Sequence, residues 1–184
     1  MHSIETSLTS TLTDVYSSID SGSSSILVSL DISAAFDMVP RDILLTTFKN
    51  TVLMDASTIE WFQSYLSSRT QSIHLNGQLS QTQPALSGVP QGSVLGSLLF
   101  MTYISPIANL LKSFNVEHQQ YADDTLIYIS TKSDFFQQSV DNLENCLYAV
   151  KSWFAHNAMS LNPTKSKTII ITTPQRLLKL KSLG

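Results

Sequence analysis

Two β-prone segments that lead into aspartates place the strongest constraint on the fold of this chain. Residues 26–30 form a short apolar run that ends at Asp31, as expected of a buried strand that delivers a carboxylate at its end. Residues 116–121 and 125–130 are also β-prone, and Asp123 and Asp124 lie between them, which predicts a hairpin with acids at its tip. If these strands are neighbours in one sheet, we expect the three carboxylates to lie together.

The acidic hairpin tip has two interpretations on pattern alone. Adjacent aspartates repel each other, and a bound cation relieves that repulsion, so the pair suits a magnesium site for phosphoryl transfer. Aspartate also favours turns for local hydrogen-bonding reasons, and a pair such as Asp123 and Asp124 is more often a solvated turn. At this level both interpretations stay open.

The remaining pattern predicts one α+β domain over residues 26–184, preceded by a polar and partly disordered leader over residues 1–25. The Asn76-Gly77 pair predicts a hairpin between residues 71–75 and 78–82. Apolar periodicity predicts helices at residues 43–49, 57–66, 94–111 and 133–156. A last β-prone run predicts a strand at residues 168–172. We expect a small antiparallel sheet with helices packed on one face.

Composition limits the classes of protein that this chain can represent. With 184 residues and 42% hydrophobic content the chain can bury one sizeable core. The net charge of −3 argues mildly against a surface that grips nucleic acid, although a site made of carboxylates lowers the count. No apolar run approaches the ~20 residues that a membrane span needs, and no secretory signal is visible, so we expect an intracellular protein that does not enter membranes.

Five segments together resemble the catalytic motifs of non-LTR (LINE-type) retrotransposon reverse transcriptases, in the order and spacing of that family. The first three are LDISAAFDMV at residues 30–39, SGVPQGSVLG at 87–96 and YADD at 121–124. Residues 153–167 are similar to the fourth motif, and residues 181–184 to the opening of the fifth. The resemblance implies a polymerase palm with part of the fingers, and an RNA-directed DNA polymerase activity.

The resemblance also implies the roles of individual residues. Asp31, Asp123 and Asp124 would hold two Mg²⁺ ions, with Mn²⁺ as a substitute, and the main-chain carbonyl of Ile32 would assist. Phe36 matches the aromatic ring that excludes a ribose 2′-hydroxyl, although an ordinary core aromatic fits the pattern equally well.

Three further positions match residues that contact the incoming nucleotide in this family. Gln91 and Gly92 correspond to residues that approach that nucleotide, and a simple helix-entry turn is the alternative. Lys165 corresponds to a charge near the leaving pyrophosphate, and the alternative is a solvated loop lysine.

The implied partners are an RNA template, a DNA primer and a dNTP. Residues 1–25 contain no lysine or arginine, and the resemblance ends at the start of the fifth motif. We therefore expect a piece of a larger polyprotein that lacks part of the fingers, the thumb and any endonuclease, and that acts in the cytoplasm and nucleus. A non-catalytic retrotransposon remnant, or a nucleic-acid-binding module that retains the fold, is the alternative.

Overall fold

The computed structural model describes residues 4–121 and 123–181, and these residues divide into two compact units. The sheet unit contains the described residues of segments 1–33, 107–156 and 160–184, and the helical unit contains residues 34–106 and 157–159. The catalytic carboxylates predicted from the sequence all belong to the sheet unit, whereas Phe36 and the loop of Gln91 belong to the helical unit.

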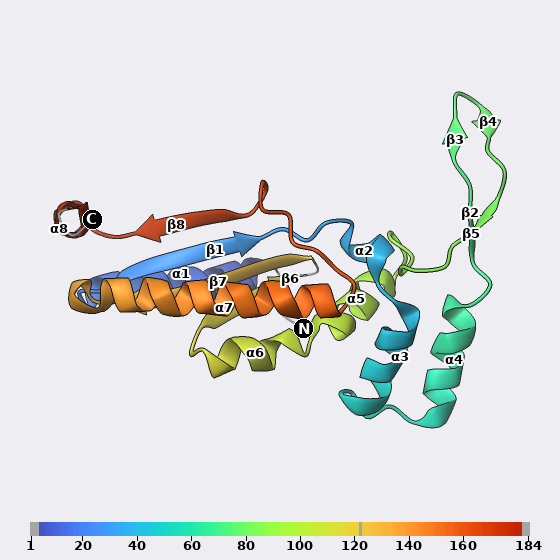
Figure 1. Ribbon diagram of the computed structural model, residues 1–184, viewed down its shortest axis with the longest axis horizontal. Coiled ribbons are helices and arrows are strands. Elements are labelled where there is room, and N and C mark those ends of the chain that lie inside the picture. Colours follow the sequence, from blue (N-terminus) through green and yellow to red (C-terminus); the bar gives the residue numbers. More distant parts are fainter. Residues whose placement is uncertain (1–3, 122, 182–184) are drawn as a thin grey trace. The chain divides into compact units, whose positions relative to one another are not determined.

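The sheet unit is built around a four-stranded antiparallel sheet with the strand order β6-β7-β1-β8 (Figure 1). The strands are β1 (Ser24–Leu30), β6 (Glu117–Tyr121), β7 (Asp124–Thr131) and β8 (Lys167–Ile171). β1 and β7 are the two central strands, because each is paired on both sides. The predicted hairpin of residues 116–130 is therefore confirmed, and its second strand is the neighbour of β1.

One face of this sheet carries the apolar core. Ile26, Val28 and Leu30 alternate along β1 and are almost fully buried, as the period of two in a strand requires. Helix α7 (Phe136–His156) buries Leu143, Cys146, Val150 and Phe154, which recur at helical spacing. The Ser139 hydroxyl of α7 lies 2.8 Å from the Thr131 hydroxyl of β7, which places α7 on this face. Helix α6 (Ile107–Ser113) contacts both α7 and β6. The predicted α+β fold with a small antiparallel sheet is confirmed, but the helices are not confined to one face as predicted.

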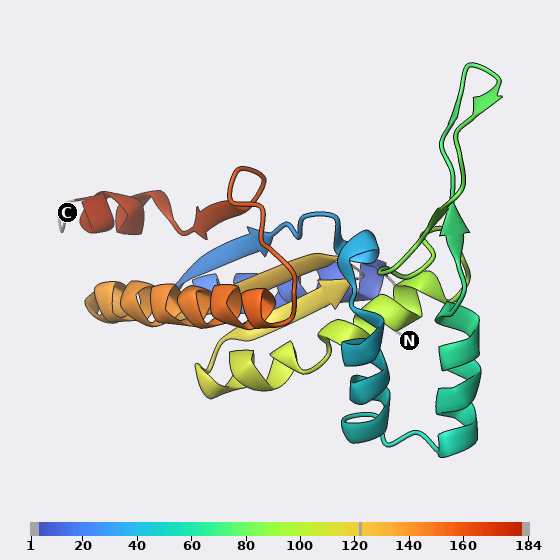
Figure 2. The ribbon, with the colours of Figure 1, turned by 45° about the vertical axis from the view of Figure 1, so that its right-hand side comes forward.

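Helix α1 (Ile4–Asp20) lies against the opposite face of the sheet, as Figures 1 and 2 both show. The Tyr128 hydroxyl of β7 donates to the Asp14 carboxylate at 2.7 Å, and the hydroxyls of Ser18 and Ser25 lie 2.6 Å apart. The prediction of a polar, partly disordered leader over this stretch therefore differs from the structure. The reason is that most stability of a helix in a protein comes from tertiary contacts, which a polar sequence does not reveal.

The carboxyl end of α1 is held by a residue from the far end of the chain. Arg176, in helix α8 (Pro174–Lys181), donates from Nη1 to the carbonyls of Ile19 at 3.2 Å and Ser23 at 2.9 Å. Arginine suits this position because the last carbonyls of a helix lack partners within the helix. A residue distant in sequence thus completes a helix that local propensity leaves weak.

The helical unit has a small core of its own, made by four helices. They are α2 (Ala35–Met38), α3 (Arg41–Asn50), α4 (Ala56–Leu66) and α5 (Gly96–Ile104). The rings of Phe48 and Phe62 pack with centroids 4.6 Å apart, and Leu44 and Phe100 are fully buried. The Asp55 carboxylate accepts from the Thr58 amide at 3.0 Å and so caps α4. The helices predicted at residues 43–49 and 57–66 are confirmed.

The region between α4 and α5 forms the predicted hairpin, with shorter strands than expected. β3 (His74–Leu75) pairs with β4 (Gln78–Leu79), and β2 (Thr70–Gln71) pairs with β5 (Gln83–Pro84). The turn residues Asn76 and Gly77 have φ values of 51° and 77°, as a type I′ turn requires. The helix predicted over residues 94–111 is interrupted near Pro106, since proline cannot donate within a helix. None of the described helices is long and apolar enough to cross a membrane.

Candidate active site

Strand register brings two predicted carboxylates to the adjoining ends of neighbouring strands. β1 pairs with β7 from Ser24 opposite Thr131 to Leu30 opposite Thr125. Asp31 directly follows Leu30, and Asp124 directly precedes Thr125, so the two aspartates lie one residue beyond the last pair of this register. Side chains directly opposite in an antiparallel pair have Cβ atoms about 5 Å apart and point to the same face. If the register continues by one residue, Asp31 and Asp124 face each other at the adjoining ends of β1 and β7.

Asp123 lies in the tight connection between β6 and β7. Tyr121 and Asp124 are Cα partners, so Asp123 lies within the turn that joins the two strands. Ala122, the other residue of that turn, lies outside the described residues. Asp123 and Asp124 are exposed, whereas Asp31 is half-buried. All three aspartates thus lie at the same end of the central strands.

The carboxylates have the chemistry of a divalent metal site, although the side chains are not gathered around a single point. Carboxylate oxygens are the hard donors that Mg²⁺ and Mn²⁺ prefer, so the donor set fits these ions. Among residues 4–121 and 123–181, no hydrogen bond or ion pair engages the carboxylates of Asp31, Asp123 or Asp124. Within the same residues, no group of three His, Cys, Asp or Glu side chains is arranged to hold a metal ion.

The main chain of Asp31 is fixed by the loop over residues 160–166. The Asn162 amide donates to the Asp31 carbonyl at 2.8 Å, and the Asp31 amide donates to the Ser166 hydroxyl at 3.2 Å. The Ser166 hydroxyl in turn donates to the Asn162 carbonyl at 2.8 Å. Ile32, whose carbonyl is a predicted ligand, forms an isolated bridge with Leu161. Both main-chain groups of Asp31 are therefore satisfied, which holds the residue where the strand ends.

Lys165 belongs to the same loop. Its amide donates to the Asn162 carbonyl at 3.3 Å, while its side chain is exposed. The Asn162 side chain accepts from the amide and the hydroxyl of Thr164 at 3.2 and 2.7 Å, so this short segment is a compact turn. The sequence did not predict the contacts of Asn162 and Ser166 with Asp31. The turn-forming composition of the segment was the one indication of a compact loop there.

Phe36 lies in the helical unit, on the single turn of α2. Its ring packs on the ring of Phe100 with centroids 5.1 Å apart and planes tilted by 31°. Phe100 is fully buried, whereas Phe36 is half-buried. Phe36 is therefore anchored on the core through one side and partly open to solvent, which differs from an ordinary core aromatic.

Gln91 and Gly92 lie in the loop that precedes α5, and both are exposed. Gly92 has a φ of +77°, and a Cβ atom built there would meet nothing within 4 Å, so conformation rather than space requires a glycine. The loop is fixed just before Gln91 by two amides. Gly88 donates to the Val39 carbonyl at 2.9 Å and Val89 donates to the Phe36 carbonyl at 2.8 Å. The predicted nucleotide contacts Phe36 and Gln91 therefore belong to two segments that are hydrogen-bonded to each other.

Two tyrosine hydroxyls have strongly raised pKa values, one in each unit. Burial raises the pKa of Tyr103 to about 12, and the charge of Asp42 adds to the effect. Burial also raises the pKa of Tyr128 to about 12, with a further contribution from the Asp14 carboxylate that accepts a hydrogen bond from its hydroxyl. Both tyrosines therefore remain protonated near neutral pH and serve as hydrogen-bond donors. The Tyr103 hydroxyl donates to the Asn157 carbonyl, and the Tyr128 hydroxyl donates to the Asp14 carboxylate.

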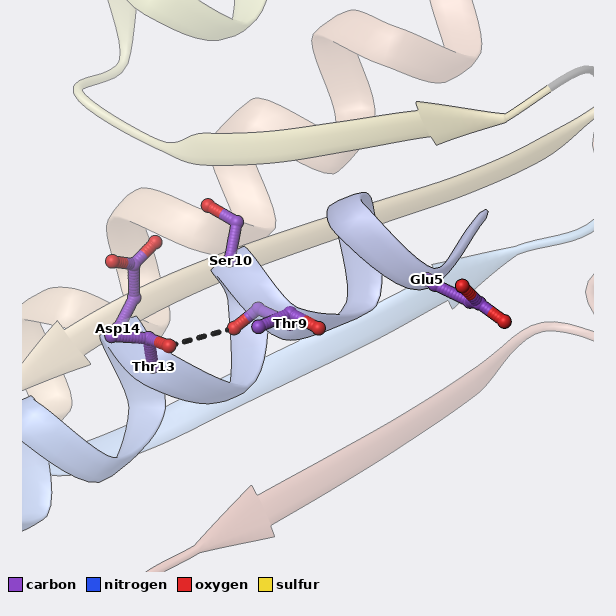
Figure 3. Close-up of a pocket in the computed structure, with 5 residues that line it drawn as sticks. All are labelled: Glu5, Thr9, Ser10, Thr13 and Asp14. Atoms are coloured by element: carbon purple, nitrogen blue, oxygen red, sulfur yellow. Dashed lines mark hydrogen bonds between the residues drawn. The ribbon is translucent and has the colours of Figure 1, made fainter. Parts of the chain in front are cut away.

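Figure 3 shows a pocket along α1, separate from the residues predicted for catalysis. The residues that line it are Glu5, Thr9, Ser10, Thr13 and Asp14. The Thr13 hydroxyl donates a hydrogen bond to the Thr9 carbonyl at 2.8 Å, and the Asp14 carboxylate accepts one from the Tyr128 hydroxyl. The lining among the described residues is acidic and hydroxylic, so this pocket lacks a basic group to attract phosphates.

An antiparallel sheet with helical cover, carrying aspartates at the ends of its central strands, defines the palm class of polymerase folds. The chain belongs to the reverse transcriptase (RNA-dependent DNA polymerase) family, because residues 2–182 match the profile of that family. The family carries a general dependence on divalent metal ions.

The curated relatives include RNA-directed DNA polymerases of mobile elements. The chain is 30% identical over 145 residues to the enzyme of the mobile element jockey from Drosophila melanogaster, which covers 76% of this chain and 15% of that protein. It is 31% identical over 152 residues to the jockey enzyme of Drosophila funebris, covering 80% and 16%. The probable RNA-directed DNA polymerase of the X-element is 27% identical over 149 residues. The resemblance to non-LTR retrotransposon enzymes is confirmed, and the chain spans about 15% of the length of these relatives.

Solved structures of similar fold include telomerases. Apo telomerase from Candida tropicalis has a TM-score of 0.67 at 13% identity, and the match covers 92% of this chain and 36% of that chain. Telomerase from Candida albicans, solved with a fragment of telomeric RNA, has a TM-score of 0.57 at 15% identity over 92% of this chain and 32% of that chain. At such identities the likeness shows a shared fold, which confirms the polymerase palm.

Proposed function

We propose that this chain is the palm of an RNA-directed DNA polymerase that transfers a nucleotide from a dNTP to the 3′-hydroxyl of a primer. One observation supports the proposal more than the others. In a chain of the reverse transcriptase family, Asp31 follows the last paired residue of β1, Asp124 begins the neighbouring strand β7, and Asp123 lies in the adjoining turn. Carboxylates gathered at one end of adjacent strands are what two-metal phosphoryl transfer requires of a protein.

The aspartates are the proposed metal ligands. Asp31 and Asp124 would hold the ions, Asp123 would complete the acidic group, and the Ile32 carbonyl would add a main-chain oxygen. Two Mg²⁺ ions, for which Mn²⁺ would substitute, supply Lewis-acid chemistry when bound, which makes the primer hydroxyl more acidic and stabilises the leaving phosphates. The loop of Asn162 and Ser166 supports this role, because it holds the main chain of Asp31 on both sides.

Residues outside the acidic group are proposed to select and orient the nucleotide. The Phe36 ring, which packs on Phe100 and is partly open to solvent, would exclude a ribose by collision with its 2′-hydroxyl. Gln91 and Gly92 are exposed and would approach the incoming nucleotide. Lys165, exposed in the loop beside Asp31, would place a positive charge near the leaving pyrophosphate.

The proposed partners are an RNA template, a DNA primer and a dNTP, at work in the cytoplasm and nucleus as for a retrotransposon protein. Support comes from the family and from curated relatives named as RNA-directed DNA polymerases of mobile elements. Because the chain spans about 15% of the first of those relatives, further regions of such proteins would grip the duplex.

Primer extension tests the proposed function. The assay contains a poly(A) template, an oligo(dT) primer, Mg²⁺ and dTTP, and compares this chain, a longer form that includes flanking regions of a matching element, and Asp123→Asn in each. We expect the longer form to extend the primer and Asp123→Asn to abolish this extension. Asp134→Asn, which changes an exposed acid of the same unit, should leave the extension unchanged.

An inert longer form, or full activity in its Asp123→Asn variant, would refute the catalytic assignment. Binding of the RNA–DNA duplex without any extension would instead support the alternative, a non-catalytic remnant that retains the fold and binds nucleic acid.

A further inference from the structure

Two segments of the helical unit, far apart in sequence, are joined by several hydrogen bonds, and we name this junction the latch. One segment is residues 36–41 and the other is residues 87–89. In addition to the two amide bonds described above, the Ser87 hydroxyl donates to the Asp37 carbonyl at 3.0 Å. The latch begins at Phe36 in one segment and ends directly before Pro90 and Gln91 in the other.

Arg41 is the one charged side chain among these contacts. Its Nη2 donates to the Ser87 carbonyl at 3.2 Å and its Nε donates to the Gly88 carbonyl at 3.5 Å. A guanidinium presents its N–H groups in a rigid planar fork, so one arginine can hold two consecutive carbonyls at once. Arg41 thereby fixes the orientation of both peptide groups that precede Val89.

The surroundings of Arg41 show that an ion pair does not account for its position. Within the described residues no carboxylate lies within salt-bridge distance of its guanidinium. Burial and the positive charge of Arg69 both lower the pKa of Arg41, so its environment slightly disfavours the charge. The Ser87 and Gly88 carbonyls are the hydrogen-bond partners of this half-buried cation.

Gly88 shows how closely the two segments approach. It has a φ of +84°, and a Cβ atom built there would lie 2.9 Å from the Asp37 carbonyl oxygen and 3.0 Å from the Phe36 carbonyl oxygen. The 2.9 Å distance is shorter than a real Cβ atom tolerates and the 3.0 Å distance is tighter than most, so the main chains are in close contact. Any loosening of the latch must therefore move the main chain of Phe36 relative to the loop of Gln91.

We propose that Arg41 is a positioning residue that holds the Phe36 segment and the Gln91 loop in a fixed arrangement, and that nucleotide affinity and sugar selectivity depend on it. This proposal rests on the proposed function, because it assumes that Phe36 and Gln91 contact the incoming nucleotide. The Phe36 ring can discriminate between sugars only if it is held steady against the displacement that a 2′-hydroxyl would cause. The Arg41 fork would supply that rigidity from outside the nucleotide site.

Two measurements on Arg41→Met test the proposal. The first is amide hydrogen exchange at Gly88 and Val89, which donate across the latch. We expect exchange at both amides to accelerate about tenfold, while the amides of β1 and β7 keep their protection. Arg69→Met is the matched control, because Arg69 lies in the same unit but donates to the Tyr65 carbonyl instead.

The second measurement is steady-state primer extension with dUTP and with UTP, which differ only in the 2′-hydroxyl, using a form of the protein that extends the primer. For Arg41→Met we expect the KM for dUTP to rise and the preference for dUTP over UTP to fall, with a smaller change in kcat. Arg69→Met should retain the wild-type values. If Arg41→Met does not fold, Arg41→Gln, which keeps a shorter amide donor, takes its place in both measurements.

The outcomes separate this proposal from the proposed function. Unchanged exchange at Gly88 and Val89 in the Arg41 variant would overturn the proposal, because Arg41 would then not hold the two segments. Faster exchange without any change in KM or selectivity would overturn it as well, because Arg41 would then not position the nucleotide contacts. A wild-type protein that incorporates no nucleotide would instead refute the proposed function, and with it the link to selectivity, while the exchange data would still decide whether Arg41 holds the two segments.

Discussion

The sheet unit and the helical unit position their functional side chains in different ways. In the sheet unit, Asp31 and Asp124 lie at the same end of the continuous β1–β7 pairing, in which many main-chain hydrogen bonds fix one register. In the helical unit, Phe36 and Gln91 are related by a few turn-to-turn contacts and by one arginine side chain. The first arrangement should tolerate single substitutions around it, whereas the second should be sensitive to each of its few contacts.

The largest expected effect separates chemistry from stability in the sheet unit. Asp31→Asn removes a carboxylate charge but keeps the size of the side chain and the main-chain contacts with Asn162 and Ser166. The rate of primer extension should fall at least ~100-fold, because metal-assisted charge stabilisation is worth several kcal/mol and about 1.4 kcal/mol corresponds to tenfold. Urea unfolding should show an unchanged midpoint. A lowered unfolding midpoint in Asp31→Asn would contradict the view that this carboxylate serves the chemistry rather than the fold.

The next effect concerns the closest main-chain contact of the helical unit. Gly88→Ala places a Cβ atom against the Asp37 carbonyl and also strains a positive φ, so stability should fall by about 2–4 kcal/mol. Gly92→Ala is the matched control, because its φ is also positive but its Cβ atom would meet nothing within 4 Å. It should cost about 1–2 kcal/mol from conformation alone. Urea unfolding measures both, and equal losses would show that the latch is not tightly packed.

A smaller effect is expected where the sheet unit uses a single side chain. Ser166→Ala removes the hydroxyl that joins the Asp31 amide to the Asn162 carbonyl and should cost about 1 kcal/mol. Because Asp31 also keeps its pairing with the Asn162 amide, the rate of extension should fall by less than tenfold. Ser166→Thr retains a hydroxyl and should preserve most of both quantities. A loss as large as that of Asp31→Asn would mean that the loop, rather than the strand register, places the carboxylate.

The smallest effect appears only at alkaline pH and compares one tyrosine from each unit. The pKa values of Tyr103 and Tyr128 are raised from 10.0 to about 12 in the folded protein. Their contribution to stability is therefore complete below pH 10 and is lost as the pH rises towards 12. Tyr103→Phe and Tyr128→Phe should each weaken this alkaline loss of stability in urea unfolding. If both variants lose as much stability at alkaline pH as the wild type does, groups other than these tyrosines cause the loss.

The sequence predicted best those features that depend on local pattern. The β-prone runs and the position of Asp31 at a strand end follow from alternation and from the change of period after it, and the Asn76-Gly77 turn follows from its φ requirement. Helix α1 was not predicted, since its stability depends on contacts such as Asp14 with Tyr128, which are far apart in the chain. Polar composition alone does not show these contacts.

The roles of the candidate residues came from the family resemblance, and their supports came only from the structure. Nothing in the sequence indicates that Arg41 would reach the Ser87 and Gly88 carbonyls, because the two segments are separated by α3, α4 and the hairpin. The Ser166 contact with Asp31 likewise joins residues that lie far apart in the chain. Long-range contacts of single side chains leave no periodic pattern, so sequence analysis cannot detect them.

The central claim is that the aspartates at the ends of β1 and β7 form a divalent metal site, and Mn²⁺ binding followed by electron paramagnetic resonance tests it most directly. Titration of the wild-type protein should show bound Mn²⁺ that competes with Mg²⁺, and Asp31→Asn combined with Asp124→Asn should abolish this binding while the fold is retained. Asp134→Asn should bind as the wild type does. Unaltered Mn²⁺ binding by the Asp31 and Asp124 variant would contradict the claim.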